Sequence, residues 1–181
     1  KAFSHFFVID ENSMNILSKN GFQNSTVIGD SRFERVMNIQ KSCNKIENIE
    51  KFKGSKLCVV AGSTWKEDDE LFINFINKMD SDNVCFIIVP HQIRKKTTDR
   101  IKNSLKCNVT IISNFQINNR IKSKVMLVDS VGILTKIYSY ADIAYVGGGM
   151  GTTGLHNTLE PAVFKTPVII GKNYDKFDEV N

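Results

Sequence analysis

The sequence predicts an α/β fold built on a doubly wound parallel sheet. Eight short apolar runs rich in β-branched residues recur along the 181 residues, without the strict alternation of strands that have one face in water. Helical patterns lie between several of these runs, and such alternation is typical of a parallel sheet covered on both faces. The predicted strands are residues 6–9, 26–28, 57–61, 84–89, 109–112, 125–128, 143–146 and 168–170.

The clearest helix is predicted over residues 67–79. Its apolar side chains repeat at helical spacing, and the acidic residues at positions 67–69 suit the positive N-terminal end of a helix. Shorter helices are predicted over residues 133–140 and 158–164.

The first 45 residues contain a second, smaller pattern of strand, helix, strand and helix. Residues 40–54 follow with few strong signals, which is typical of a hinge or linker. We therefore place a domain boundary near Cys43.

The composition describes a globular chain. Its 41% hydrophobic residues exclude a disordered or fibrous protein, and its length suffices for one well-buried domain. The net charge of +5 suits an anionic partner such as a nucleotide, a nucleic acid or an acidic membrane. The lysines are spread along the chain, and residues 94–96, the densest cluster, resemble a solvated helix face. We therefore expect no nucleic-acid partner.

Cysteine spacing and known motifs exclude several kinds of site. The four cysteines lie far apart, so neither a zinc site nor a disulfide framework is indicated, and reduced cytosolic thiols fit best. There is no H-E-x-x-H, P-loop or D-x-D signature, and we expect no metal or cofactor. No apolar run reaches the ~20 residues that span a bilayer, so we expect this chain to be soluble.

Polar residues follow several predicted strands, at the edge where a Rossmann-like sheet binds its ligand. Ser63 and Thr64 precede an acidic helix, where they either bind a phosphate or only cap the helix. After the next strand, Pro90 and His91 offer an imidazole to an anion, although a histidine there is often plain polar surface. Residues 128–132 close another strand, and main-chain groups near Ser130 and Gly132 there suit the edge of a pyrimidine.

Residues 141–161 form the strongest motif, a strand followed by a glycine-rich loop and the start of a helix. Asn157 suits the N-cap of this helix, which places Glu160 at its third position. The helix end and the glycine loop favour a phosphate, and Glu160 then suits a pair of ribose hydroxyls. The alternative is a capping box in which Glu160 only folds back on the helix start. His156 lies beside this motif, with the same ambiguity as His91.

The loop also fits the dinucleotide pattern G-x-G-x-x-G at Gly149, Gly151 and Gly154. A nicotinamide or flavin enzyme is therefore an alternative. The fit is poor because the motif lies late in the sheet and, after Glu160, no carboxylate follows before Asp175, beyond the spacing of ~20 residues expected for the ribose-binding acid.

Four ordered segments resemble the C-terminal domain of 3-deoxy-D-manno-octulosonic acid (Kdo) transferases, which are GT-B glycosyltransferases. They read GSTWKEDDE, IIVPHQIRK, LVDSVGILTKIYSYADIAYVGGG and GLHNTLEPAVFKTPVIIG. The resemblance covers residues 57–178, and the earlier VIGDSRFERV resembles the crossover from the N-terminal domain. It implies that residues 1–44 end that domain and that residues 45–181 form a nucleotide-sugar-binding domain, shortened at its C-terminus.

The resemblance implies an inverting, metal-independent transferase that moves Kdo from CMP-Kdo to a lipid A precursor in lipopolysaccharide biosynthesis. The family works at the cytoplasmic face of the bacterial inner membrane. Its catalytic carboxylate, acceptor surface and membrane anchor belong to the N-terminal domain, so we expect no catalytic residue in this chain. The chain alone is expected to bind a cytidine nucleotide weakly, without turnover.

Carried over by position, the resemblance makes Asn157 and Glu160 ligands of CMP and sets the glycine loop near the donor. At the position of His91 many members have Arg, so neutralisation of the donor phosphate becomes weaker, pH-dependent or shared with Arg94. The predicted donor-binding residues are Ser63, Thr64, Pro90, His91, Ser130, Gly132, Gly149, Gly151, Gly154, His156, Asn157 and Glu160.

Two further readings stay open. A GT-B transferase or epimerase that uses a UDP-sugar is possible, because glutamates at helix starts bind ribose in several such families. A non-catalytic nucleotide-binding module is the other, favoured by the lack of a catalytic acid and by the weak clustering of charge.

Overall fold

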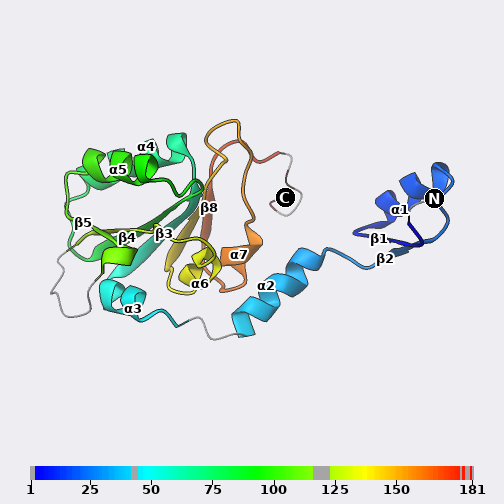
Figure 1. Ribbon diagram of the computed structural model, residues 1–181, viewed down its shortest axis with the longest axis horizontal. Coiled ribbons are helices and arrows are strands. Elements are labelled where there is room, and N and C mark those ends of the chain that lie inside the picture. Colours follow the sequence, from blue (N-terminus) through cyan, green and yellow to red (C-terminus); the bar gives the residue numbers. More distant parts are fainter. Residues whose placement is uncertain (1–2, 42–44, 116–122, 176, 178–179, 181) are drawn as a thin grey trace.

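The computed structural model describes residues 3–41, 45–115, 123–175, 177 and 180. Figure 1 shows a main body formed by a sheet with helices on both faces, and a small N-terminal unit that lies apart from it. Helix α2 connects the two. The predicted boundary at Cys43 lies outside the described residues.

The main body is a six-stranded parallel sheet in the order β5-β6-β4-β3-β7-β8. This confirms the predicted fold class. The strands are β3 (Leu57–Thr64), β4 (Val84–Pro90), β5 (Val109–Ile111), β6 (Val125–Leu127), β7 (Ile143–Val146) and β8 (Val168–Ile170). After β6 the chain crosses to the other side of β3, so the strand order reverses between β3 and β7. Ligands of open α/β sheets bind at such a switch point.

Helices cover both faces of the sheet (Figure 1). On one face lie α4 (Lys66–Lys78) and α5 (Lys95–Ser104). On the other lie α3 (Glu47–Lys53), α6 (Leu134–Tyr138) and α7 (Leu159–Ala162). The side chains of β4 alternate between two hydrophobic cores, with Phe86 and Ile88 on the α4 face and Ile87 on the α3 face. A strand buried on both sides has no polar alternation, which explains its continuous apolar sequence.

The N-terminal unit is a β-α-β motif. Strands β1 (Phe6–Val8) and β2 (Ser25–Val27) pair in parallel, and α1 (Glu11–Lys19) joins them. Helix α2 (Ser31–Lys41) follows and reaches the main body, where the Gln40 side chain donates to the carbonyl of Val163 at 2.8 Å. The pattern of elements predicted for the first 45 residues is therefore confirmed.

Two predictions about local structure were wrong. Residues 40–54 were predicted as a linker, yet they include α3, whose Ile49 and Phe52 are buried in the core. A helix of seven residues is too short for its two apolar positions to form a periodic signal. The strand predicted at residues 57–61 continues through Thr64, so Ser63 and Thr64 belong to β3 and not to a loop after it.

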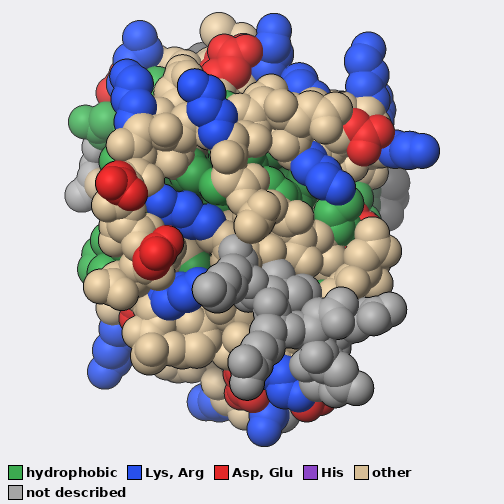
Figure 2. All heavy atoms as spheres, turned by 90° about the vertical axis from the view of Figure 1, so that its left-hand side faces the viewer, with side chains coloured by type: hydrophobic (Ala, Val, Ile, Leu, Met, Phe, Trp, Pro, Cys, Tyr) green, Lys and Arg blue, Asp and Glu red, His purple; other side chains and the backbone are tan. Residues whose placement is uncertain are grey.

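Positive charge is dispersed over the surface. Figure 2 shows the end of the molecule that carries β5, where Lys and Arg side chains are scattered around exposed hydrophobic atoms. On α5, Lys95, Lys96 and Lys102 are exposed, with Asp99 between them. This agrees with the solvated helix face predicted for residues 94–96.

Candidate functional site

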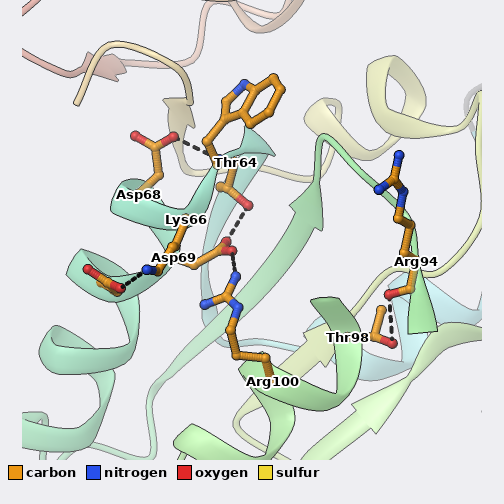
Figure 3. Close-up of polar contacts among 9 residues, drawn as sticks. Thr64, Lys66, Asp68, Asp69, Arg94, Thr98 and Arg100 are labelled. Atoms are coloured by element: carbon orange, nitrogen blue, oxygen red, sulfur yellow. Dashed lines mark hydrogen bonds and ion pairs between the residues drawn. The ribbon is translucent and has the colours of Figure 1, made fainter. Parts of the chain in front are cut away.

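The buried carboxylate of Asp68 fixes the carboxyl edge of the sheet. Asp68 lies in the first turn of α4 and is fully buried. It accepts hydrogen bonds from the backbone N–H of Trp65 at 2.9 Å, from the N–H of Gly148 at 2.8 Å and from the hydroxyl of Tyr145. Figure 3 shows it pointing back toward the end of β3. Asp68 therefore ties the start of the glycine loop to the start of α4.

Internal packing explains several glycines of the loop. Gly148 and Gly154 both have φ of 94°, a conformation that favours glycine. A Cβ atom on Gly149 would lie 3.0 Å from the Cα of Gly171, and one on Gly151 would lie 3.1 Å from the carboxylate of Glu67. The loop needs glycines to fold against its own neighbours, so their presence does not by itself indicate a ligand. The binding roles given to Gly149, Gly151 and Gly154 stay predictions.

Three aromatic rings gather where β3, β4 and the glycine loop meet. His91 stacks on Trp65 and on His156, with ring centroids 4.5 Å apart in each pair. The indole Nε1 of Trp65 donates to Nε2 of His156 at 3.0 Å. The structure thus joins the two predicted histidines, which are 65 positions apart in the sequence, into one cluster.

His156 is partly desolvated, whereas His91 is exposed. Burial lowers the pKa of His156 below its ordinary value, and the nearby His91 lowers it further. Asp68 opposes this shift. His156 is therefore neutral near pH 7, where it still offers one ring N–H to a ligand.

Residues from three strand ends line one cavity of about 210 Å³ at the carboxyl edge. Five of the predicted donor-binding residues contribute to it, namely Ser63 from β3, Pro90 and His91 from β4, and Ser130 and Gly132 after β6. Cavities that enclose a drug-sized ligand measure about 300–1,000 Å³. This one therefore has room for only a part of a nucleotide.

The helix start after the glycine loop differs from the prediction in detail. Helix α7 begins at Leu159, and Thr158 before it has helical dihedrals of −78° and −18°. The side chain of Asn157 accepts from the N–H of Leu159 at 3.0 Å, so Asn157 caps this turn as predicted. Glu160 accepts instead from the hydroxyl of Thr135 on α6 at 2.9 Å. Its carboxylate is thus directed toward α6, which does not favour the capping-box alternative.

Thr64 does not share the cavity of the other strand-end residues. It is buried, and its hydroxyl donates to Asp69 at 2.6 Å, while Asp69 also pairs with Arg100 (Figure 3). Burial raises the pKa of Asp69, although Thr64 and Arg100 oppose the shift. Thr64 lines a separate cavity of about 170 Å³ with Trp65 and Gln92. Its first role is to hold Asp69 in place.

Two residues of the site were not predicted. Trp65 was read only as part of a motif, because a single aromatic before a helix carries no signal of its own. Thr135 lies in the first turn of α6, and nothing in its local sequence relates it to Glu160, 25 positions later. Both contacts join segments that only the sheet brings together.

Among the described residues, no group of three His, Cys, Asp or Glu side chains could hold a metal ion. Within the same residues, no helix is both long and apolar enough to cross a membrane. The thiols of Cys58, Cys85 and Cys107 are free.

The fold and this edge define an α/β domain of the type that forms the C-terminal half of GT-B glycosyltransferases. The C-terminal CMP-Kdo binding domain of WaaA from Acinetobacter baumannii has the same fold, with a TM-score of 0.61 at 22% identity. The match covers 82% of this chain and 74% of that one. No family model matches the sequence.

Sequence relatives agree with this class. The chain is 35% identical over 137 residues to a bifunctional glycosyltransferase/methyltransferase of Fusobacterium nucleatum, covering 74% of this chain and 20% of that protein. It is 33% identical over 124 residues to a Kdo transferase of Haemophilus influenzae and 30% over 146 to one of Aquifex aeolicus. These matches cover 67% and 77% of this chain, and 29% and 40% of the relatives.

The predicted resemblance to the C-terminal domain of the Kdo transferases is therefore confirmed, and the chain is a homologue of these enzymes over this segment. It spans less than half the length of each of the three relatives.

Proposed function

We propose that this chain is the donor-binding part of a Kdo transferase that moves Kdo from CMP-Kdo to a lipid A precursor in lipopolysaccharide biosynthesis. The cavity at the carboxyl edge carries the proposal, because it unites Ser63, His91 and Ser130 from three segments. Each segment belongs to a motif that resembles the Kdo transferases. The relatives, which are glycosyltransferases, support the same activity.

Each polar group of the edge suits one part of the donor. The carboxylate of Glu160 only accepts hydrogen bonds, which suits the two ribose hydroxyls of CMP. The cavity beside Ser130 and Gly132 suits the pyrimidine, whose edge main-chain groups can read. His91 and His156 suit the phosphate, together with main-chain N–H groups of the glycine loop. No metal is required in this arrangement.

The remaining steps belong to the N-terminal domain of such an enzyme. Under this proposal residues 1–44 end that domain and residues 45–181 bind the donor. The catalytic carboxylate, the acceptor site and the attachment to the cytoplasmic face of the inner membrane lie in the N-terminal domain. The chain alone binds a cytidine nucleotide and does not turn over.

Calorimetric titration with CMP tests the proposal. We expect weak binding to the chain and a loss of about 10-fold or more for Glu160→Gln, since a hydrogen bond to a charged group contributes about 1.5–3 kcal/mol. Glu11→Gln on α1 is the matched control, because it removes the same charge from an exposed position outside the site. No binding at millimolar CMP, or equal affinity of both variants, contradicts the assignment.

Comparison of pyrimidine nucleotides separates CMP from the UDP-sugar alternative. CMP is expected to bind more tightly than UMP or UDP, since a 4-amino group replaces the 4-oxo group at the edge that the cavity reads. Tighter binding of UDP would instead support an enzyme of the same fold that uses a UDP-sugar.

The affinity for CMP is expected to change by less than about 2-fold between pH 8 and pH 7. Burial lowers the pKa of His156, so its imidazole stays neutral over this range and donates one ring N–H to the phosphate. Calorimetric titrations at the two pH values measure the affinity. A rise of about 10-fold or more toward pH 7 would show that the phosphate binds a protonated imidazole instead.

A further inference from the structure

Trp65 lies at the centre of the candidate site, where hydrogen bonds hold both its backbone and its side chain. Its backbone N–H donates to the buried Asp68, and its indole N–H donates to Nε2 of His156. Its ring also stacks on His91, with an interplanar angle of 24°. The indole is thus placed by β3 and α4 and contacts both histidines of the site.

The hydrogen bond from Trp65 determines which ring nitrogen of His156 is protonated. A neutral imidazole has one N–H and one bare nitrogen. Nε2 of His156 accepts the indole N–H, so the proton resides on Nδ1. Among the described residues the ring of His156 makes its hydrogen bond through Nε2, and no buried side-chain nitrogen lacks a partner, so Nδ1 of the half-buried ring faces solvent. The Nδ1–H is therefore a donor available to a ligand.

We propose that Trp65 is a positioning residue that holds His156 in the Nδ1–H tautomer, so that this N–H donates to an oxygen of the donor's phosphate. The inference rests on the proposed function and adds to it a residue and the atom through which it acts. Because Trp65 sets this tautomer before the ligand binds, no free energy is spent on converting His156 from the other tautomer.

Tautomer populations are measured directly by ¹⁵N chemical shifts of the His156 ring. The wild-type chain is expected to show a protonated Nδ1 and a bare Nε2 near pH 8. Trp65→Phe keeps a ring to stack on His91 and removes only the N–H, so the two tautomers of His156 are expected to mix. Unchanged ring shifts in Trp65→Phe overturn the proposal. Amide spectra of both proteins verify that the fold is retained.

Ligand titrations connect the tautomer to the phosphate. Trp65→Phe is expected to weaken CMP binding about 3- to 10-fold and to leave cytidine, which has no phosphate, within about 2-fold, as the loss of one hydrogen bond predicts. Equal losses for CMP and cytidine would mean that Trp65 acts on the nucleoside and would overturn the proposal. Trp65→Leu, which also removes the stacking ring, separates the two contributions.

A double-mutant cycle shows whether Trp65 acts through His156. In the background of His156→Ala, Trp65→Phe is expected to cause no further loss of CMP affinity, because coupled residues are not additive. Additive losses overturn the proposal. Failure of the wild-type chain to bind CMP would instead contradict the proposed function, and the ring shifts would still decide whether Trp65 controls the tautomer.

Discussion

The chain contains two parallel β-α-β arrangements that differ in how much they bury. In the main body, β4 is buried along six of its seven residues, and its side chains enter cores on both faces of the sheet. In the N-terminal unit, β1 and β2 have no buried residue, and neither has α1. Phe7 and Ile28 are 67% and 60% exposed. The same local pattern therefore forms with and without a core.

The difference shows what a β-α-β pattern requires to become stable. An isolated pair of strands with one helix covers a single face, so the apolar side chains on the other face stay in water. The main body adds four further strands and helices on both sides. Stability and the candidate site are therefore expected to depend on the main body, while the apolar surface of the N-terminal unit is available for contact.

The largest expected effect is that of Asp68→Ala. The substitution leaves the N–H of Gly148 and the hydroxyl of Tyr145 without their buried acceptor, which costs about 3–5 kcal/mol in free energy of unfolding. Urea unfolding followed by circular dichroism measures the loss. Glu70→Ala, an exposed acid of the same helix, is the control and is expected to cost at most about 0.5 kcal/mol. Equal losses would mean that the loop is held by other contacts.

A smaller, pH-dependent loss is expected for Arg100→Gln. Arg100 is the ion-pair partner of Asp69, whose side chain is 1% exposed, so the variant leaves a buried charge and loses about 3 kcal/mol near pH 7. Burial already raises the pKa of Asp69, and losing Arg100 raises it further, so Asp69 protonates more readily as the pH falls. The loss is therefore expected to shrink toward pH 4. A loss that is independent of pH would contradict the buried pair.

Lys51→Gln is the matched control for Arg100→Gln, because it also replaces a positively charged side chain with glutamine. Lys51 pairs with Glu47 on the surface of α3 at 2.8 Å, and both side chains are exposed. An exposed pair of this kind contributes little to the free energy of unfolding, because solvent screens it. Thermal unfolding of both variants at two salt concentrations tells the exposed pair from the buried one, because salt screens only the former effectively.

The smallest effect on stability is expected for Phe7→Ser combined with Ile28→Ser. Both side chains are exposed, so their removal is expected to change the free energy of unfolding of the main body by less than about 0.5 kcal/mol. Self-association, measured by sedimentation velocity, is expected to decrease because exposed apolar area is removed. A large loss of stability would show that the N-terminal unit packs on the main body after all.

Apolar patterning predicted all eight strands and the long helix of the part of the chain that the structure describes. In central strands such as β4, burial on both faces leaves a continuous apolar signal, whereas β1 and β2 are apolar runs without a buried residue. Apolar patterning failed at α3, where Ile49 and Phe52 alone mark the buried side, and at the end of β3, where Ser63 and Thr64 are polar within a strand. Hydroxyl side chains at a strand end resemble a loop in sequence, although Thr64 still pairs with Pro90 after an irregularity at Ser63, whose φ is 53°.

For the candidate site, the sequence by itself determined only the local patterns, which are strand ends, a glycine loop and a helix start. Only the tertiary structure decided that Glu160 contacts Thr135 and that Trp65 joins His91 to His156. The physical reason is that parallel strands bring their carboxyl ends together in an order set by the crossover from β6 to β7. No local pattern encodes that order, so the partners across the edge become visible only in the folded sheet.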